Sequence, residues 1–204
     1  MAPDNSDARA CVLVLPGGKV RSDEASRWWQ LANLRMVFIA AALRRRLGRS
    51  VEVRRVQYRR RGWNSPRLDA VRDAADILDQ VRQAHEPRAP VNPKNIVLVG
   101  HSMGGRVAAR LASDGDIGAV VALAPWWPRE DGDLIPARTR LLVVHGTADT
   151  RTDPRSSRTQ TCRARQRGLD AQWAGIEGAG HSMVRRWSLW HSRTTDFVAE
   201  YLQR

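Results

Sequence analysis

A serine lies between glycines in the stretch NIVLVGHSMGG, residues 95–105. The pentapeptide GHSMG, centred on Ser102, fits the pattern G-x-S-x-G, with an apolar run before it and small residues after it. In that context the pattern is typical of a nucleophile elbow, a sharp turn from strand to helix that exposes a serine hydroxyl. The other interpretation is an N-cap serine between turn glycines, and the motif by itself leaves both open.

A serine hydroxyl is a weak nucleophile at neutral pH, so it needs a base, and the base needs an acid to orient it. Asp149 follows the apolar run LLVVH, and His181 follows the predicted strand at residues 170–176. Because the carboxyl ends of parallel strands meet at one edge of a sheet, we expect both to lie near Ser102. The chain order Ser, Asp, His, at separations of 47 and 32 residues, favours the nucleophile over the cap.

The elements that must position these residues alternate along the chain. Six short apolar runs are predicted to be strands, at residues 10–15, 51–58, 95–100, 117–123, 141–145 and 170–176. The segments between them are predicted to be helices, at residues 25–47, 67–85, 102–113, 153–167 and 183–202. This alternation predicts an α/β fold with a doubly wound, mostly parallel six-stranded sheet and helices on both faces. We expect a single domain over residues 1–204.

The chain resembles α/β-hydrolases over nearly its whole length, in VLVLPGG, NIVLVGHSMGG, LLVVHGTADTRTDP and GAGHSM. It is most similar to small members without a cap, such as dienelactone-hydrolase-like esterases, although those often carry cysteine in place of Ser102. The segment 125–139, where larger members insert a cap, is short here. The resemblance implies a minimal α/β-hydrolase fold with no cap domain. It implies that Ser102 is the nucleophile, His181 the general base and then acid, and Asp149 the residue that orients the imidazole.

Two further residues are alternatives for these roles, and a third histidine is not. Asp153 is the second candidate for the acid, but its position also suits the N-cap of the following helix. His191 is the second candidate for the base, although it is expected on a helix face. His145 ends a predicted strand and is expected to be structural.

The oxyanion hole of such a site uses two backbone N–H groups. One is expected from Met103, the residue after the nucleophile. The other is expected from the loop after the first strand, Pro16-Gly17-Gly18-Lys19, where Gly18 is favoured over Lys19.

The predicted substrate pocket is open and shallow. Gly17 and His101 are expected to lie beside the elbow, and Trp126 and Trp127 are the best candidates for lining an acyl or aromatic pocket. The alternative is that these tryptophans bury against helices as large apolar bodies.

Charge distinguishes this chain, with 34 Lys and Arg against 21 Asp and Glu and a net charge of +13 over 204 residues. Only Lys19 and Lys94 are lysines. Nucleic-acid or membrane-surface binding would explain the charge, and so would a source with arginine-rich codon usage. Because no known nucleic-acid motif accompanies it, we expect weak attraction to anionic partners and no specific nucleic-acid binding.

Several classes of protein are disfavoured by the remaining features. Cys11 and Cys162 belong to no metal-ligand pattern, so neither a metal nor a cofactor is expected. No apolar run is long enough for a membrane span. Met1–Arg9 lack the layout of a secretory signal, which predicts a cytoplasmic protein.

Together these features predict a serine hydrolase that cleaves a small carboxylic ester or thioester through an acyl-enzyme. Its partner is expected to be a small-molecule acyl substrate, and the oligomeric state is left open. Two alternatives remain at this stage: a non-catalytic binding protein on a hydrolase scaffold, and an acyltransferase that uses the same triad.

Overall fold

The computed structural model describes residues 10–84 and 92–203 and contains one sheet. Six strands pair in the order β2-β1-β3-β4-β5-β6, and all the pairs within the described residues are parallel. The predicted doubly wound α/β fold is therefore confirmed, with a sheet that is wholly rather than mostly parallel. The strands are β1 (Ala10–Leu15), β2 (Val51–Arg55), β3 (Ile96–His101), β4 (Ala119–Leu123), β5 (Arg140–Gly146) and β6 (Ala171–Ile176).

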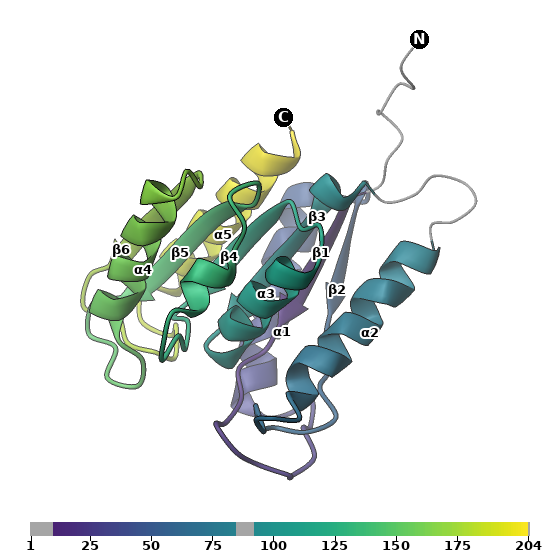
Figure 1. The fold of residues 1–204 in the computed structure, drawn as a ribbon, viewed down its shortest axis with the longest axis horizontal. Helices are drawn as coiled ribbons and strands as arrows, with labels where there is room; N and C mark the ends of the chain where they lie inside the picture. The colour runs from purple at the N-terminus through teal and green to yellow at the C-terminus, as the bar shows by residue number, and fades with distance from the viewer. Residues whose placement is uncertain (1–9, 85–91, 204) are drawn as a thin grey trace.

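Helices cover both faces of the sheet (Figure 1). One face is covered by α2, α3 and α4, and the other by α1 and α5. Two short 3₁₀ helices, η2 (Pro93–Asn95) and η3 (Asp131–Leu134), lie in connections. The α-helices are α1 (Leu31–Leu47), α2 (Asp69–Ala84), α3 (Met103–Asp114), α4 (Pro154–Gln166) and α5 (Trp187–Leu202).

The central strands read as continuous apolar runs because both of their faces are buried. In β1, Leu13 packs in the core under α2 and α3, whereas Val14 packs in the core under α1 and α5. Leu13 pairs in register with Leu98 of β3, and both are fully buried. Burying one such side chain contributes roughly 1.5–3 kcal/mol, so these strands hold a rigid base for the loops at their carboxyl ends.

The first helix begins at Leu31, not near residue 25 as predicted. Residues 16–30 instead lie against the loop at 56–68. The Lys19 N–H donates to the Arg61 carbonyl at 2.8 Å, and the Trp63 N–H donates to the Lys19 carbonyl at 2.8 Å. These long-range hydrogen bonds hold the segment out of a helix.

The last helix begins at Trp187, not at residue 183. Met183 and Arg186 have φ angles of 59° and 56°, which a right-handed helix does not accommodate. The strand predicted over residues 51–58 ends at Arg55, where the chain enters the 56–68 loop.

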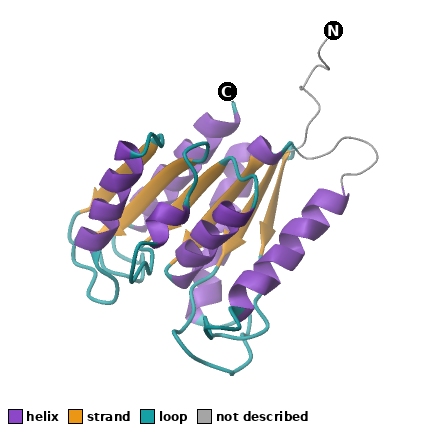
Figure 2. Ribbon diagram, in the orientation of Figure 1, coloured by secondary structure: helices purple, strands orange, loops and turns teal. Residues whose placement is uncertain are grey.

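Loops gather at the edge of the sheet where the strands end (Figure 2). The connection between β4 and β5 consists of a loop and η3, with no inserted cap in this described segment. Within residues 10–84 and 92–203, no helix combines the length and apolar character that a bilayer crossing requires. The expectation for Met1–Arg9 concerns residues outside the described ranges, and the cytoplasmic location stays a prediction.

Candidate active site

Ser102 occupies the turn between β3 and α3 with a backbone conformation of φ 54° and ψ −116°. An L-residue adopts such angles only under local strain, which is typical of functional turns. The flanking glycines make the turn possible. A Cβ on Gly100 would lie 2.2 Å from the Gly104 carbonyl oxygen, and a Cβ on Gly104 would lie 2.2 Å from the Leu15 carbonyl oxygen. The elbow is therefore a close approach of helix and strand that tolerates no larger residue at these two positions.

The structure brings the three predicted residues together in one hydrogen-bonded row. His181 Nε2 lies 3.0 Å from Ser102 Oγ, and His181 Nδ1 lies 2.8 Å from Asp149 Oδ2. Asp149 follows β5 and His181 follows β6, so three loops at one sheet edge supply the row. With its Nδ1 proton donated to the carboxylate, the imidazole presents Nε2 as an acceptor to the serine hydroxyl.

Asp149 is buried and accepts hydrogen bonds at both oxygens. Its Oδ1 accepts the backbone N–H groups of Arg151, at 2.8 Å, and Thr152, at 3.1 Å. Its Oδ2 accepts from the Thr152 hydroxyl at 2.7 Å. Burial raises the pKa of Asp149, but hydrogen bonds from His145, His181 and Thr152 outweigh it and hold this pKa well below the usual range. The carboxylate therefore stays ionised beside His181.

Asp149 also contacts a second histidine, His145, which was not predicted from the sequence. It is fully buried at the end of β5, and its Nε2 lies 3.1 Å from Asp149 Oδ2. Its Nδ1 lies 2.8 Å from the Ser157 hydroxyl, which fixes the ring from the other side. The side chain predicted to be structural is thus also a hydrogen-bond partner of Asp149.

His101 packs against the other side of His181. It is 1% exposed, and its Nε2 donates to the His181 carbonyl oxygen at 2.9 Å. The two rings lie 4.8 Å apart between centroids. Burial lowers the pKa of His101 to about 3, so the ring is neutral and holds the His181 backbone as a hydrogen-bond donor.

The two alternative residues lie elsewhere. Asp153 caps α4, where its side chain accepts the Arg155 N–H at 2.8 Å. His191 lies on α5 with its ring 5.1 Å from the Trp187 ring. Neither has a hydrogen bond to Ser102 or His181 in the described part of the chain, so both act locally.

The loop after β1, which was predicted to supply an oxyanion-hole donor, lies against the elbow. Met103 is the first residue of α3, so its N–H has no acceptor within the helix. A Cβ on Gly18 would lie 2.6 Å from Met103 Sδ, which places this glycine close to the elbow. Lys19 donates its N–H to the Arg61 carbonyl, so this N–H is already engaged, and the role of Gly18 stays a prediction.

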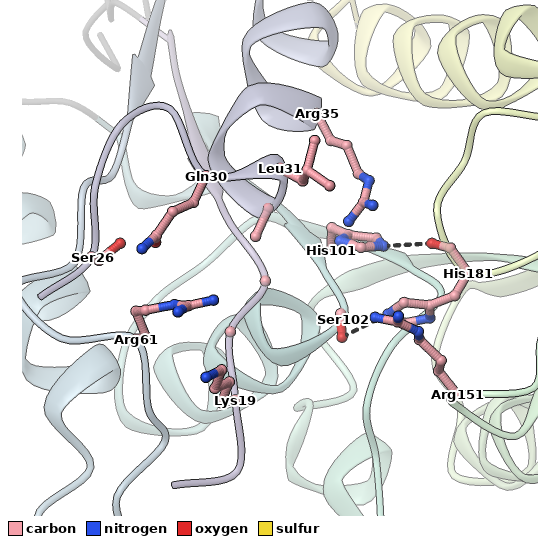
Figure 3. A pocket seen from close by; sticks show the side chains of 13 residues that line it. Lys19, Ser26, Gln30, Leu31, Arg35, Arg61, His101, Ser102, Arg151 and His181 are labelled. Atoms are coloured by element: carbon pink, nitrogen blue, oxygen red, sulfur yellow. Dashed lines mark hydrogen bonds between the residues drawn. The ribbon is translucent and has the colours of Figure 1, made fainter. Parts of the chain in front are cut away.

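A cavity of about 360 Å³ opens at Ser102 (Figure 3). The predicted pocket residues Gly17 and His101 line it. Four basic residues line it too: Lys19, Arg35, Arg61 and Arg151. The three arginines were not predicted from the sequence. In a chain with 34 Lys and Arg, their types carried no signal that could single them out. The other residues around the cavity are Gly18, Ser26, Gln30, Leu31, Ala32, Ser102 and His181.

Trp126 and Trp127, which were predicted to line the substrate pocket, do not line this cavity. They line a second, smaller cavity of about 220 Å³ together with Arg151 and Thr152, so their place in the substrate pocket stays a prediction. Trp127 is 4% exposed, and its indole N–H donates to the Gly105 carbonyl at 3.2 Å. The Trp126 ring lies 6.1 Å from the Trp63 ring in an edge-on contact, with the Arg106 guanidinium 4.6 Å from its centroid. Both tryptophans therefore pack against α3 and its neighbours, which is the alternative role considered from the sequence.

No set of three or more His, Cys, Asp and Glu side chains is arranged to hold a metal ion among the described residues. Cys11 is buried and Cys162 is exposed, and both are free thiols.

The model of the alpha/beta hydrolase family matches residues 12–148, which is more than half of the chain. The chain belongs to this family. The match includes the loop after β1, the elbow at Ser102 and the strand that leads to Asp149. No curated protein sequence matches the chain.

Solved structures share the fold at low sequence identity. An alpha/beta hydrolase of unknown function from Agrobacterium tumefaciens is 16% identical, with a TM-score of 0.74 over 96% of this chain and 87% of that one. A thermophilic esterase from Thermogutta terrifontis, solved with propionate bound, is 20% identical, with a TM-score of 0.66 over 99% and 85%. SOBER1 of Arabidopsis thaliana is 18% identical, with a TM-score of 0.66 over 96% and 100%.

Proposed function

We propose that this alpha/beta hydrolase is a serine esterase or thioesterase that acts through an acyl-enzyme on Ser102. The observation that carries the proposal is the position of His181, with Nε2 3.0 Å from the Ser102 hydroxyl and Nδ1 2.8 Å from Asp149. A general base must lie within hydrogen-bond distance of the proton it removes, and this one does so without rearrangement. The alternative of a non-catalytic binding protein expected a misaligned row, which this geometry does not favour.

In the first half-reaction, Ser102 Oγ attacks the substrate carbonyl carbon as its proton passes to His181 Nε2. The imidazolium that forms is stabilised by the ionised Asp149. The carbonyl oxygen becomes an oxyanion, to which the N–H groups of Met103 and Gly18 donate. The tetrahedral intermediate then collapses, and the alcohol or thiol leaves with the proton from His181.

In the second half-reaction, a water molecule gives a proton to His181 Nε2 and attacks the acyl carbon. The new intermediate collapses, Ser102 leaves as the alcohol with the proton from His181, and a carboxylic acid is released. All steps use side chains and backbone groups already present at the sheet edge.

A small acyl group suits this site. The cavity of about 360 Å³ has space for a short substrate but not for a long lipid chain. Structures of the Thermogutta terrifontis esterase with propionate and with butyrate bound show short acids in a protein of the same fold.

A fluorophosphonate probe tests the proposal directly. We expect it to label the native protein and to inhibit hydrolysis of para-nitrophenyl butyrate, whereas Ser102→Ala is neither labelled nor active. The matched control is Ser192→Ala, since Ser192 is exposed on α5 and its hydroxyl bonds to the Leu189 carbonyl of the same helix. Equal labelling of native protein and Ser102→Ala would contradict the proposal.

A further inference from the structure

The cavity at Ser102 is strongly cationic. Lys19, Arg35, Arg61 and Arg151 line it, and none of the described residues that line it is Asp or Glu. They come from different parts of the chain: the loop after β1, helix α1, the loop before α2 and the loop after β5. The folded chain therefore gathers four positive charges around the proposed nucleophile.

One carboxylate compensates part of this charge. Glu24 lies 3.6 Å from Lys19 Nζ and also pairs with Arg61. These contacts lower the pKa of Glu24, with the Arg61 hydrogen bond as the largest cause. A single carboxylate thus serves two of the four cations.

The other two cations, Arg35 and Arg151, have no ion pair with a carboxylate within residues 10–84 and 92–203. By contrast, two arginines with little exposed side chains are paired. Arg106 and Arg140 each lie 2.7 Å from a carboxylate oxygen. Arg35 is half-buried on α1 and has no such partner, whereas the unpaired Arg151 is exposed.

Arg35 and Arg151 are also close enough to interact. Burial and the charge of Arg151 both lower the pKa of Arg35. Figure 3 shows Arg35 reaching from α1 toward His101, and Arg151 at the end of the cavity lined by His181. Two like charges beside one cavity raise the free energy of the empty site, and a bound anion would lower it.

We propose that the natural substrate carries an anionic oxygen group, which Arg35 and Arg151 bind while the ester or thioester carbonyl lies at Ser102. This inference rests on the proposed function and narrows its substrate class to acidic esters. Guanidinium groups pair with carboxylate and phosphate oxygens in the same forked geometry, so both kinds of anion share the chemistry of the site. The size of the cavity thus favours short acyl chains, and the unpaired cations favour those that carry a negative charge.

A pair of matched substrates tests the inference. The ester of para-nitrophenol with one carboxyl of adipic acid has a free carboxylate, and para-nitrophenyl hexanoate has the same chain length without it. We expect kcat/KM to be about tenfold or more higher for the adipate ester, because a hydrogen bond to a charged group contributes enough free energy for a factor of that size. Higher salt should reduce the ratio because the cavity is open to solvent.

Variants assign the effect to its residues. Arg35→Gln and Arg151→Gln should each lower the ratio of the two kcat/KM values, by about tenfold if the pair holds the anion. Arg35→Lys keeps the charge and should keep most of the preference. The control Arg49→Gln removes an exposed charge beyond the far end of α1 and should leave the ratio unchanged.

The outcomes separate this inference from the proposed function. If the fluorophosphonate labels Ser102 but both esters react equally well, the charge selection is wrong and the esterase proposal stands. If Arg49→Gln lowers the ratio as much as Arg35→Gln, overall charge explains the preference, and the assignment to the cavity is wrong. If Ser102 is not labelled, the proposed function itself fails. Where the preference for the adipate ester is found, inhibition of hexanoate hydrolysis by glutarate or by inorganic phosphate shows which anion the site prefers.

Discussion

The two sides of His181 are built in opposite ways. On the acid side, Asp149 and His145 are buried, Thr152 is partly buried, and the three are hydrogen-bonded to one another. On the cavity side, Arg35 and Arg151 line the open cavity and have no carboxylate partner among the described residues. Side chains whose hydrogen bonds are all made within the protein are held in one geometry before substrate binds. Unpaired charged side chains, by contrast, can still bind a ligand.

The same short loop builds both sides. Asp149 and Thr152 face the acid side, and Arg151, between them, lines the cavity side. The Arg151 backbone N–H nevertheless donates to Asp149 at 2.8 Å, so this residue belongs to the acid side by its main chain and to the cavity by its side chain. A substitution of the Arg151 side chain can therefore alter substrate binding without removing a donor to Asp149.

Removing the charge on the acid side should have the largest effect. Asp149→Asn replaces an acceptor with an amide that no longer holds the His181 tautomer, so we expect kcat for para-nitrophenyl butyrate to fall roughly 10⁴-fold. Steady-state kinetics measure the loss, with circular dichroism as the check on folding. A loss below about tenfold would show that the acid side does not orient His181.

Removing one donor from the acid side should have an intermediate effect. His145→Leu keeps an apolar body of moderate size but deprives Asp149 of a hydrogen bond, and we expect kcat to fall roughly tenfold. The pKa of Asp149 should rise, which an NMR titration of its carboxyl carbon measures. His145→Gln retains an N–H donor and should restore part of the activity. A purely structural His145 would alter stability in both variants and leave the pKa of Asp149 unchanged.

His101 provides a test of the side of His181 that faces the cavity. Its pKa is about 3 in the folded protein, against an ordinary value of 6.5, so unfolding takes up a proton between these pH values. Stability contributed by the neutral ring is present above pH 6.5 and is lost as the pH falls below it. His101→Gln keeps a donor for the His181 carbonyl but cannot titrate. Urea titrations at pH 7.5 and pH 5 measure the free energy of unfolding of both proteins. Between these pH values it should fall less for the variant than for the native protein, with a difference of up to ~1.4 kcal/mol per pH unit. Parallel curves would contradict the burial of a neutral His101.

The smallest effect is expected from a substitution that touches neither side of His181. Trp126→Phe removes an indole that packs on Trp63 and Arg106, so we expect a loss of stability of about 0.5–1 kcal/mol. Because the Trp126 side chain does not line the cavity, kcat/KM should change less than about threefold. A large rise in KM with little change in stability would show instead that Trp126 contacts the substrate.

The sequence by itself determined the alternation of strands and helices and the order of Ser102, Asp149 and His181 along the chain. These features are local: an apolar run, a glycine-flanked serine, and an acid and a histidine just after later strands. The sheet edge then brings them together, because parallel strands place their carboxyl ends side by side. Their roles in catalysis stay proposals, but their juxtaposition followed from local patterns.

Only the tertiary structure decided the surroundings of that row. Helix α1 starts late because residues 16–30 bond to the loop at 56–68, a contact that no local pattern announces. The same pairing places Lys19 and Arg61 at the cavity, while Trp126 and Trp127 turn toward α3. In a chain rich in arginine, the charges that face Ser102 are selected by long-range packing, and this packing forms only when the whole chain has folded.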